Sequence, residues 1–272
     1  MQELLNHPAV QAGFAPFLIA LIISELFLRI RLSGLSIIAG FALTVYLVSD
    51  FGFEPLTATR KIIWLGLFSA SLGLLFGSAM SNWRSWLIVA LSGAAAVWTL
   101  QRILEQQELN IMLQWGAACA AYVAVLVWGM DKLLEKEALR VSCAATALGI
   151  GTGGAALIGA SALLGQFGLA LGSAAAAHLA IKFISNQPLP TGRMFTLPIA
   201  LIAGLTGCLA VLSAQLPWYV LPILAGIPIA AWLVPLPKQS IRVQILLLTF
   251  VTFLFVAGAL YVTWRAAGDV PL

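Results

Sequence analysis

Two pairs of ionisable residues lie in or beside apolar stretches, where charges are rare and informative. Glu25 and Arg29 are four residues apart, and so are His178 and Lys182. Residues at this spacing share one face of a helix, and an acid four residues before a base forms a favourable pair. Because a charge inside a bilayer is costly, such residues commonly mark an ion or proton pathway. These four residues are therefore the candidate transport residues of the chain.

Each pair also has a structural interpretation. Glu25 could bind a proton or cation on a transport path, or it could pair with Arg29 near the membrane surface while Arg29 extends outward. His178 could relay protons. Alternatively, it could donate one hydrogen bond to a neighbouring helix. The sequence leaves both alternatives open.

Glycines are the second group with a possible chemical role. Small residues at every fourth position let two helix backbones approach closely within lipid. The row Ala147, Gly151, Ala155 and Gly159 has this spacing and predicts a helix contact. Alternatively, four glycines within six residues could unwind the helix, and the freed carbonyl and amide groups would line a substrate site. The glycines concerned are Gly149, Gly151, Gly153, Gly154, Gly159, Gly168 and Gly172.

Residue patterns for catalysis and for metal or cofactor binding are sparse. His7 and His178 are predicted on opposite sides of the membrane, which excludes them as two ligands of one haem. Cys119, Cys143 and Cys208 lie in apolar stretches without CxxC spacing, as buried structural cysteines do. The glycine-rich segment lacks the lysine of a phosphate-binding loop. We therefore expect no cofactor and no metal, and no motif identifies an enzyme.

The elements that carry these residues are predicted to be membrane-spanning helices. Hydrophobic residues make up 61% of the 272 residues, charged residues only 9%, and the mean hydropathy is +1.02. A bilayer crossing needs about 20 apolar residues in helical form. The chain thus predicts an all-α polytopic bundle without a soluble domain, with spans at 10–28, 33–52, 62–81, 85–103, 110–129, 140–163, 166–184, 194–214, 218–235 and 243–264.

The positive charges predict the orientation of these spans. Connections on one side hold ten Lys and Arg residues, and those on the other side hold four. Because cytoplasmic loops are enriched in Lys and Arg, the ten should face the cytoplasm and both termini should lie outside. Residues 1–28 contain no Lys or Arg, so the first span is predicted to be a retained helix rather than a cleaved signal. Fusing the glycine-rich stretch 140–184 into one span would divide the charges seven against seven, which favours two spans there.

The charged segment Asp131–Arg140 divides the single predicted domain into halves, 1–130 and 131–272, with five spans each. An odd number of spans per half would make the halves inverted repeats, which is a common transporter plan. This inference rests on counting, since the halves show no clear sequence similarity.

The leading functional hypothesis is a small-solute transporter or permease of the bacterial inner membrane. The alternative is a non-catalytic accessory or scaffolding subunit of a membrane complex, which the scarcity of charge within the spans favours. The expected partners are membrane lipid, a small solute, and a second copy or another membrane subunit. With a net charge of +4 assigned to loops at the membrane surface, no nucleic-acid partner is expected.

Overall fold

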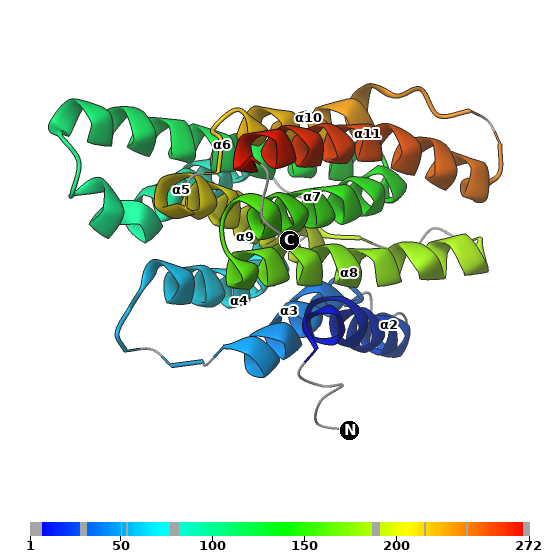
Figure 1. Cartoon of the computed structure of the whole chain (residues 1–272). Helices are drawn as coiled ribbons and strands as arrows, with labels where there is room; N and C mark the ends of the chain where they lie inside the picture. Colours follow the sequence, from blue (N-terminus) through cyan, green and yellow to red (C-terminus); the bar gives the residue numbers. More distant parts are fainter. Residues whose placement is uncertain are drawn as a thin grey trace.

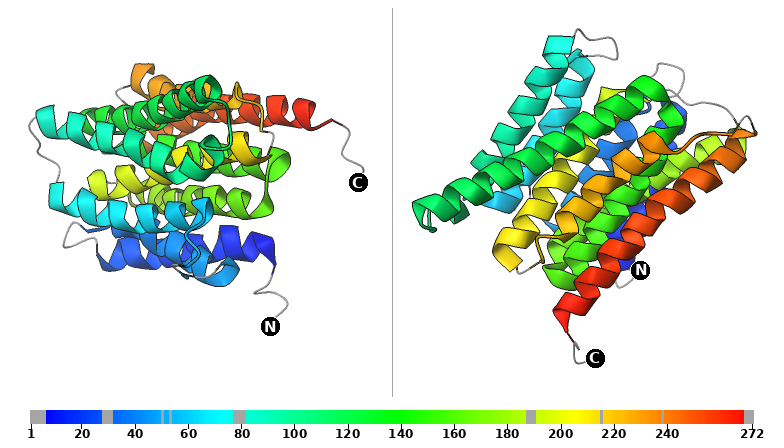
Figure 2. Two further views of the ribbon diagram at one scale, coloured as in Figure 1. Left: turned by 90° about the vertical axis from the view of Figure 1, so that its left-hand side faces the viewer. Right: turned by 90° about the horizontal axis from the view of Figure 1, so that it is seen from above.

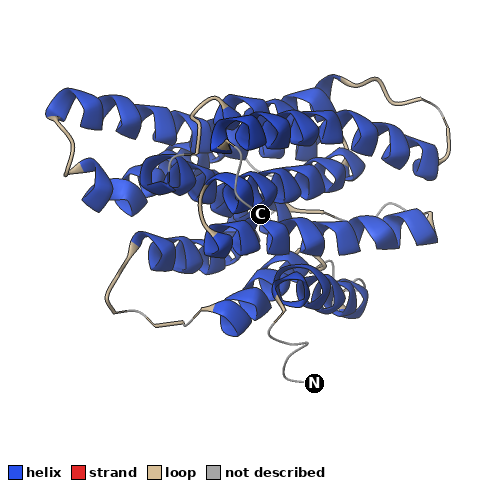
Figure 3. Ribbon diagram, viewed as in Figure 1, coloured by secondary structure: helices blue, strands red, loops and turns tan. Residues whose placement is uncertain are grey.

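The described part of the chain is helical and contains no strand. The computed structural model describes residues 7–27, 32–49, 51–52, 54–76, 82–186, 191–214, 216–237 and 239–268. Figure 3 shows helices joined by short connections. The helices are η1 (Val10–Phe14), which continues into α2 (Ala15–Leu26), then α3 (Leu35–Val48), α4 (Ala58–Phe76), α5 (Asn82–Leu104), α6 (Leu109–Lys136), α7 (Ala138–Gly159), α8 (Ala162–Ser185), α9 (Arg193–Ala214), α10 (Val220–Leu233) and α11 (Ile241–Ala267).

Seven of these helices, α4 to α9 and α11, are long and apolar enough to cross a membrane. Three segments are apolar but shorter, namely η1 with α2, α3 and α10. Each predicted span overlaps one helical segment, and the stretch 140–184 forms two long helices rather than one. These features are those of a helical membrane bundle.

The helices lie alongside one another, with α7 and α9 near the centre of the bundle (Figure 1). The hairpin of α2 and α3 packs on one side against α8, and α10 and α11 cover the opposite side (Figures 1 and 2). In its most apolar stretch, α9 is 89% buried, whereas α11 is only 28% buried. The bundle therefore has an enclosed central helix and a peripheral one whose surface suits lipid.

Glycine backbones form a close contact in the core, between the antiparallel helices α7 and α8. A Cβ atom placed on Gly149 would lie 2.6 Å from Cα of Gly172, and one on Gly153 would lie 2.7 Å from the carbonyl carbon of Gly168. Real Cβ atoms do not approach backbone this closely, so only glycine fits at these crossings.

The predicted small-residue row faces elsewhere. Gly151 packs against side chains of Leu224 on α10 and Val256 on α11, and Gly159 packs against Leu216 and Thr263. Two rows of small residues alternate on α7: one approaches the backbone of α8, and the other makes room for side chains. The helix is continuous from Ala138 to Gly159, so the segment 149–154 is not unwound.

The most charged segment is helical rather than an extended connection. Helix α6 continues to Lys136, α7 begins at Ala138, and only Glu137 separates them. The ammonium of Lys132 lies 2.8 Å from the Glu135 carboxylate, a three-residue spacing that stabilises a helix beyond its apolar part. Helix α6 therefore extends to Lys136, beyond residue 129 where the predicted span ends, because its charged last turns are stabilised as a helix.

Polar contacts bring the later predicted cytoplasmic connections together at one end of the bundle, here called the basic end, while Arg29 and Arg31 of the first connection lie outside the described residues. Arg193 contacts Asp131 and Ser85, linking the ends of α9, α6 and α5. Arg140, at the start of α7, donates to the carbonyls of Ala231 and Val234 at the end of α10. Further bonds join Lys182 to Ala138 and Arg242 to Phe183.

The two halves pack differently. Helix α7 contacts α9 and α11. In an inverted repeat, α2, α4 and α6 would correspond to α7, α9 and α11, but among the described residues α2 makes no comparable contacts with α4 and α6. The repeat therefore stays a prediction from the number of spans.

Candidate functional site

Glu25 lies at the edge of the bundle. It is the penultimate residue of α2 and its side chain is exposed, while its proposed partner Arg29 lies outside the described residues. An exposed carboxylate at a helix end does not line the interior of the bundle. Its position favours the interpretation as a surface charge over a binding site in the core.

His178 and Lys182 are both buried near the end of α8, but they have different surroundings. The Lys182 ammonium donates to the Ala138 carbonyl (2.9 Å) and to Ser142 Oγ (2.7 Å), which ties α8 to the first turn of α7. The His178 ring lies 4.9 Å from the Phe195 ring, and neither of its nitrogens has a hydrogen-bond partner among the described residues. The contacts of Lys182 thus join α8 to α7, whereas those of His178 assign it no function.

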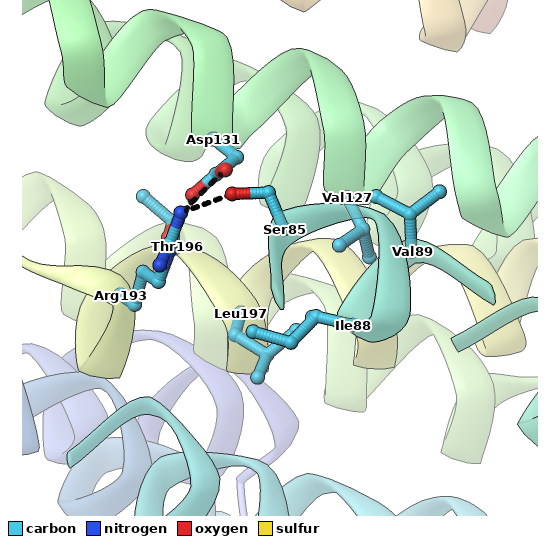
Figure 4. Close-up of a pocket in the computed structure, with 8 residues that line it drawn as sticks. All are labelled: Ser85, Ile88, Val89, Val127, Asp131, Arg193, Thr196 and Leu197. Carbon is cyan, nitrogen blue, oxygen red and sulfur yellow. Dashed lines mark hydrogen bonds and ion pairs between the residues drawn. The ribbon is translucent and has the colours of Figure 1, made fainter. Parts of the chain in front are cut away.

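The strongest polar constellation, here called the Arg193 site, joins three helices at the basic end (Figure 4). Arg193 Nε lies 2.6 Å from Asp131 Oδ1, and Nη2 lies 2.8 Å from Oδ2 and 2.6 Å from Ser85 Oγ. Both charged side chains are largely buried, at 7% and 13% exposure. The third guanidinium nitrogen, Nη1, is buried without a partner among the described residues.

Helix ends explain why these two charges need each other. Arg193 is the first residue of α9, where the helix dipole disfavours a cation, and Asp131 is in the penultimate turn of α6, where it disfavours an anion. Pairing them offsets both effects. A buried pair of this kind contributes little net stability, but removing one partner leaves a buried charge uncompensated.

Two cavities meet at this pair. An inner cavity of about 10 Å³ is lined by Ser85, Ile88, Val89, Val127, Asp131, Arg193, Thr196 and Leu197. An outer pocket of about 140 Å³ is lined by Ser85, Trp86, Trp128, Asp131 and Lys132. Ser85 and Asp131 line both, so the two cavities adjoin at the Arg193 site.

The described residues at this site include a guanidinium, a carboxylate and two hydroxyl groups. An arginine fork binds carboxylate or phosphate oxygens through paired hydrogen bonds, and here Asp131 occupies that fork. No histidine lines either cavity to act as a base for Ser85. Within the described ranges, no group of three His, Cys, Asp or Glu residues could hold a metal ion.

Sequence reasoning did not find this site. Asp131 and Arg193 are 62 residues apart, and both fall in predicted connections, where charges are expected to be solvated. No spacing rule relates residues on α6 and α9. The available signal was the presence of three acids, Asp131, Glu135 and Glu137, among the basic residues assigned to one side of the membrane, and it does not single out Asp131.

The chain matches no known protein family, and no curated protein matches its sequence.

Proposed function

We propose that the chain is a ten-span permease for a small solute in a bacterial inner membrane, with the Asp131–Arg193 pair closing its basic end. The observation that carries this proposal is that Asp131 lines both the outer pocket and the inner cavity, while its partner Arg193 lines the inner cavity. In a closed state the carboxylate of Asp131 occupies the arginine fork. In an open state the pair separates and a polar group of the solute takes its place.

Burial of the pair supports this role. A static bundle gains little from a desolvated ion pair compared with apolar residues of the same size, whereas ionisable residues within membrane proteins commonly mark a solute path. Ser85 and Thr196 add hydroxyl groups to the same cavity. The inner cavity is about the size of one water molecule, so solute passage requires movement of α9 relative to α5 and α6.

The accessibility of Thr196 tests this opening. Thr196 lines the inner cavity and is 3% exposed. In a chain whose three buried native cysteines are replaced by alanine, Thr196→Cys should react with a membrane-impermeant maleimide applied to the basic end. The reaction should accelerate in Asp131→Asn, because that substitution weakens the ion pair that is proposed to close the basic end.

Ala200→Cys is the matched control, since Ala200 lies one turn further along α9 and is fully buried. Its labelling should stay negligible in both backgrounds. If Thr196→Cys reacts as slowly as Ala200→Cys, with and without Asp131→Asn, the site does not open and the permease proposal fails.

A second candidate function is an accessory or scaffolding subunit, favoured by the close packing of the bundle. None of the three pockets described here is lined by Glu25 or Gly151, the positions where a central solute site was expected. Purification of the full chain in mild detergent distinguishes the candidates. A stoichiometric protein partner, together with an unreactive Thr196→Cys, would favour the subunit.

The proposed orientation places the basic end in the cytoplasm and both termini outside. Gln107, between α5 and α6, and Glu135, near the end of α6, are exposed at opposite ends of the bundle. In intact cells, Gln107→Cys should react with an impermeant maleimide and Glu135→Cys should react only after permeabilisation. The reverse pattern would invert the topology.

A further inference from the structure

An apolar groove runs between α6 and α10 at the basic end. It has a volume of about 330 Å³ and is lined by Trp128, Gly129, Lys132, Pro228, Ile229, Trp232 and Leu233. Lys132 is the only ionisable residue in this lining. The volume is at the lower end for a small-molecule site, and the lining suits a hydrocarbon chain.

Indole rings and ammonium groups mark one end of the groove as a membrane surface. Trp128 and Trp232 are both exposed, and tryptophans concentrate at the level of lipid headgroups. The Lys136 ammonium lies 3.9 Å from the centre of the Trp232 ring and 3.2 Å from the Trp232 carbonyl oxygen. Lys132, one turn earlier on α6, brings a second ammonium to the same end.

The charges at this end favour an anionic ligand. Glu135 pairs with Lys132, but it is exposed, and a phosphate could exchange with it in water. Among the described residues, Lys136 has no carboxylate within ion-pair distance. An apolar groove that ends beside two ammonium groups matches an acyl chain joined to a negatively charged headgroup.

We infer that the groove between α6 and α10 binds an anionic phospholipid, with one acyl chain between Trp128 and Trp232 and the phosphate at Lys132 and Lys136. Basic pockets between membrane helices recognise acidic headgroups in this way. The groove lies beside the solute path proposed above, and Trp128 and Lys132 line both the groove and the outer pocket. The lipid would connect the end of α10 to α6 at the membrane surface.

Native mass spectrometry of the full chain in detergent tests this inference. Phosphatidylglycerol should remain bound at lower lipid concentrations than phosphatidylcholine. The double variant Lys132→Gln/Lys136→Gln should bind phosphatidylglycerol roughly twenty- to thirty-fold more weakly, since each lysine near a membrane surface contributes about a factor of five. Binding of phosphatidylcholine should change little.

Two further variants locate the site. Ile229→Trp fills the groove and should weaken the binding of both lipids, while Arg265→Gln, in the last turn of α11 at the opposite end, should change neither. An unchanged thermal unfolding midpoint would show that the lysine variant is folded.

Equal retention of the two lipids, or unchanged affinity in the lysine double variant, would overturn the inference. So would displacement of phosphatidylglycerol by inorganic phosphate alone at a similar concentration, because the groove would then contribute nothing. Efficient disulfide crosslinking of two chains through Ile229→Cys in lipid-rich membranes would assign the groove to a second copy instead.

Discussion

Replacing Gly153 by leucine is expected to abolish most of the folded protein. The new side chain would begin 2.7 Å from the carbonyl carbon of Gly168, and backbone cannot move aside as a flexible side chain can. Gly153→Ala should already lower the free energy of unfolding by about 1–3 kcal/mol, despite the higher helix propensity of alanine. The measurement is the yield of monodisperse protein in detergent and its thermal unfolding midpoint.

Gly258 on α11 is the matched control. A Cβ atom there would meet only Ile223, at an ordinary distance of 3.9 Å, so Gly258→Leu should retain most of its folded yield. Gly151→Leu should be intermediate, since its close neighbours are the side chains of Leu224 and Val256. Similar losses in all three variants would mean that the α7–α8 backbone contact has no special importance.

The two glycine rows of α7 show which features of this helix its residue spacing can predict and which it cannot. The sequence correctly indicates long apolar helices over 140–184, because length and composition decide that question. It does not indicate which side of α7 approaches α8, because Gly149 and Gly153 alternate with Gly151 and Ala155. A helix surrounded by protein on several sides has small residues on more than one face. Choosing among these faces requires the partner helices.

Replacing Arg193 by alanine is expected to cost about 3–5 kcal/mol of unfolding free energy, because Asp131 would remain buried without a partner. Asp131→Asn should be similarly damaging, with the guanidinium left uncompensated. The double variant Asp131→Leu/Arg193→Met should recover much of the loss, since apolar residues of similar volume often replace a buried pair without penalty. Equilibrium unfolding of the purified variants in mixed micelles measures these differences.

Arg84→Ala provides the comparison, because Arg84 is exposed and adjacent to Ser85. It should change the unfolding free energy by no more than about 0.5 kcal/mol. If Arg193→Ala lowers the unfolding free energy as little as Arg84→Ala does, the ion pair is effectively solvated and does not close the solute path.

The candidate residues predicted from the sequence differ from those of the Arg193 site, because burial of a charge also depends on the partner helices. Hydropathy places Glu25 inside a predicted span, which made it a candidate transport residue. The helix ends one residue later, however, and the carboxylate is exposed. Asp131 follows the apolar part of α6, where a solvated charge is expected, yet it is largely buried beside Arg193 of α9 and Ser85 of α5. Hydropathy along the chain describes insertion into lipid, whereas burial also depends on neighbours distant in sequence.

The enclosed position of α9 has a consequence for synthesis of the protein. The helices α3, α4, α5, α6, α7 and α8 all pack against it, and all of them precede it in the chain. When α9 leaves the translocation channel, its surrounding helices have therefore already been made, so it can exchange lipid for protein contacts at once. Helices α10 and α11 follow and pack onto α6 and α7. The order of helices along the chain thus allows the interior to close before α10 and α11 are added.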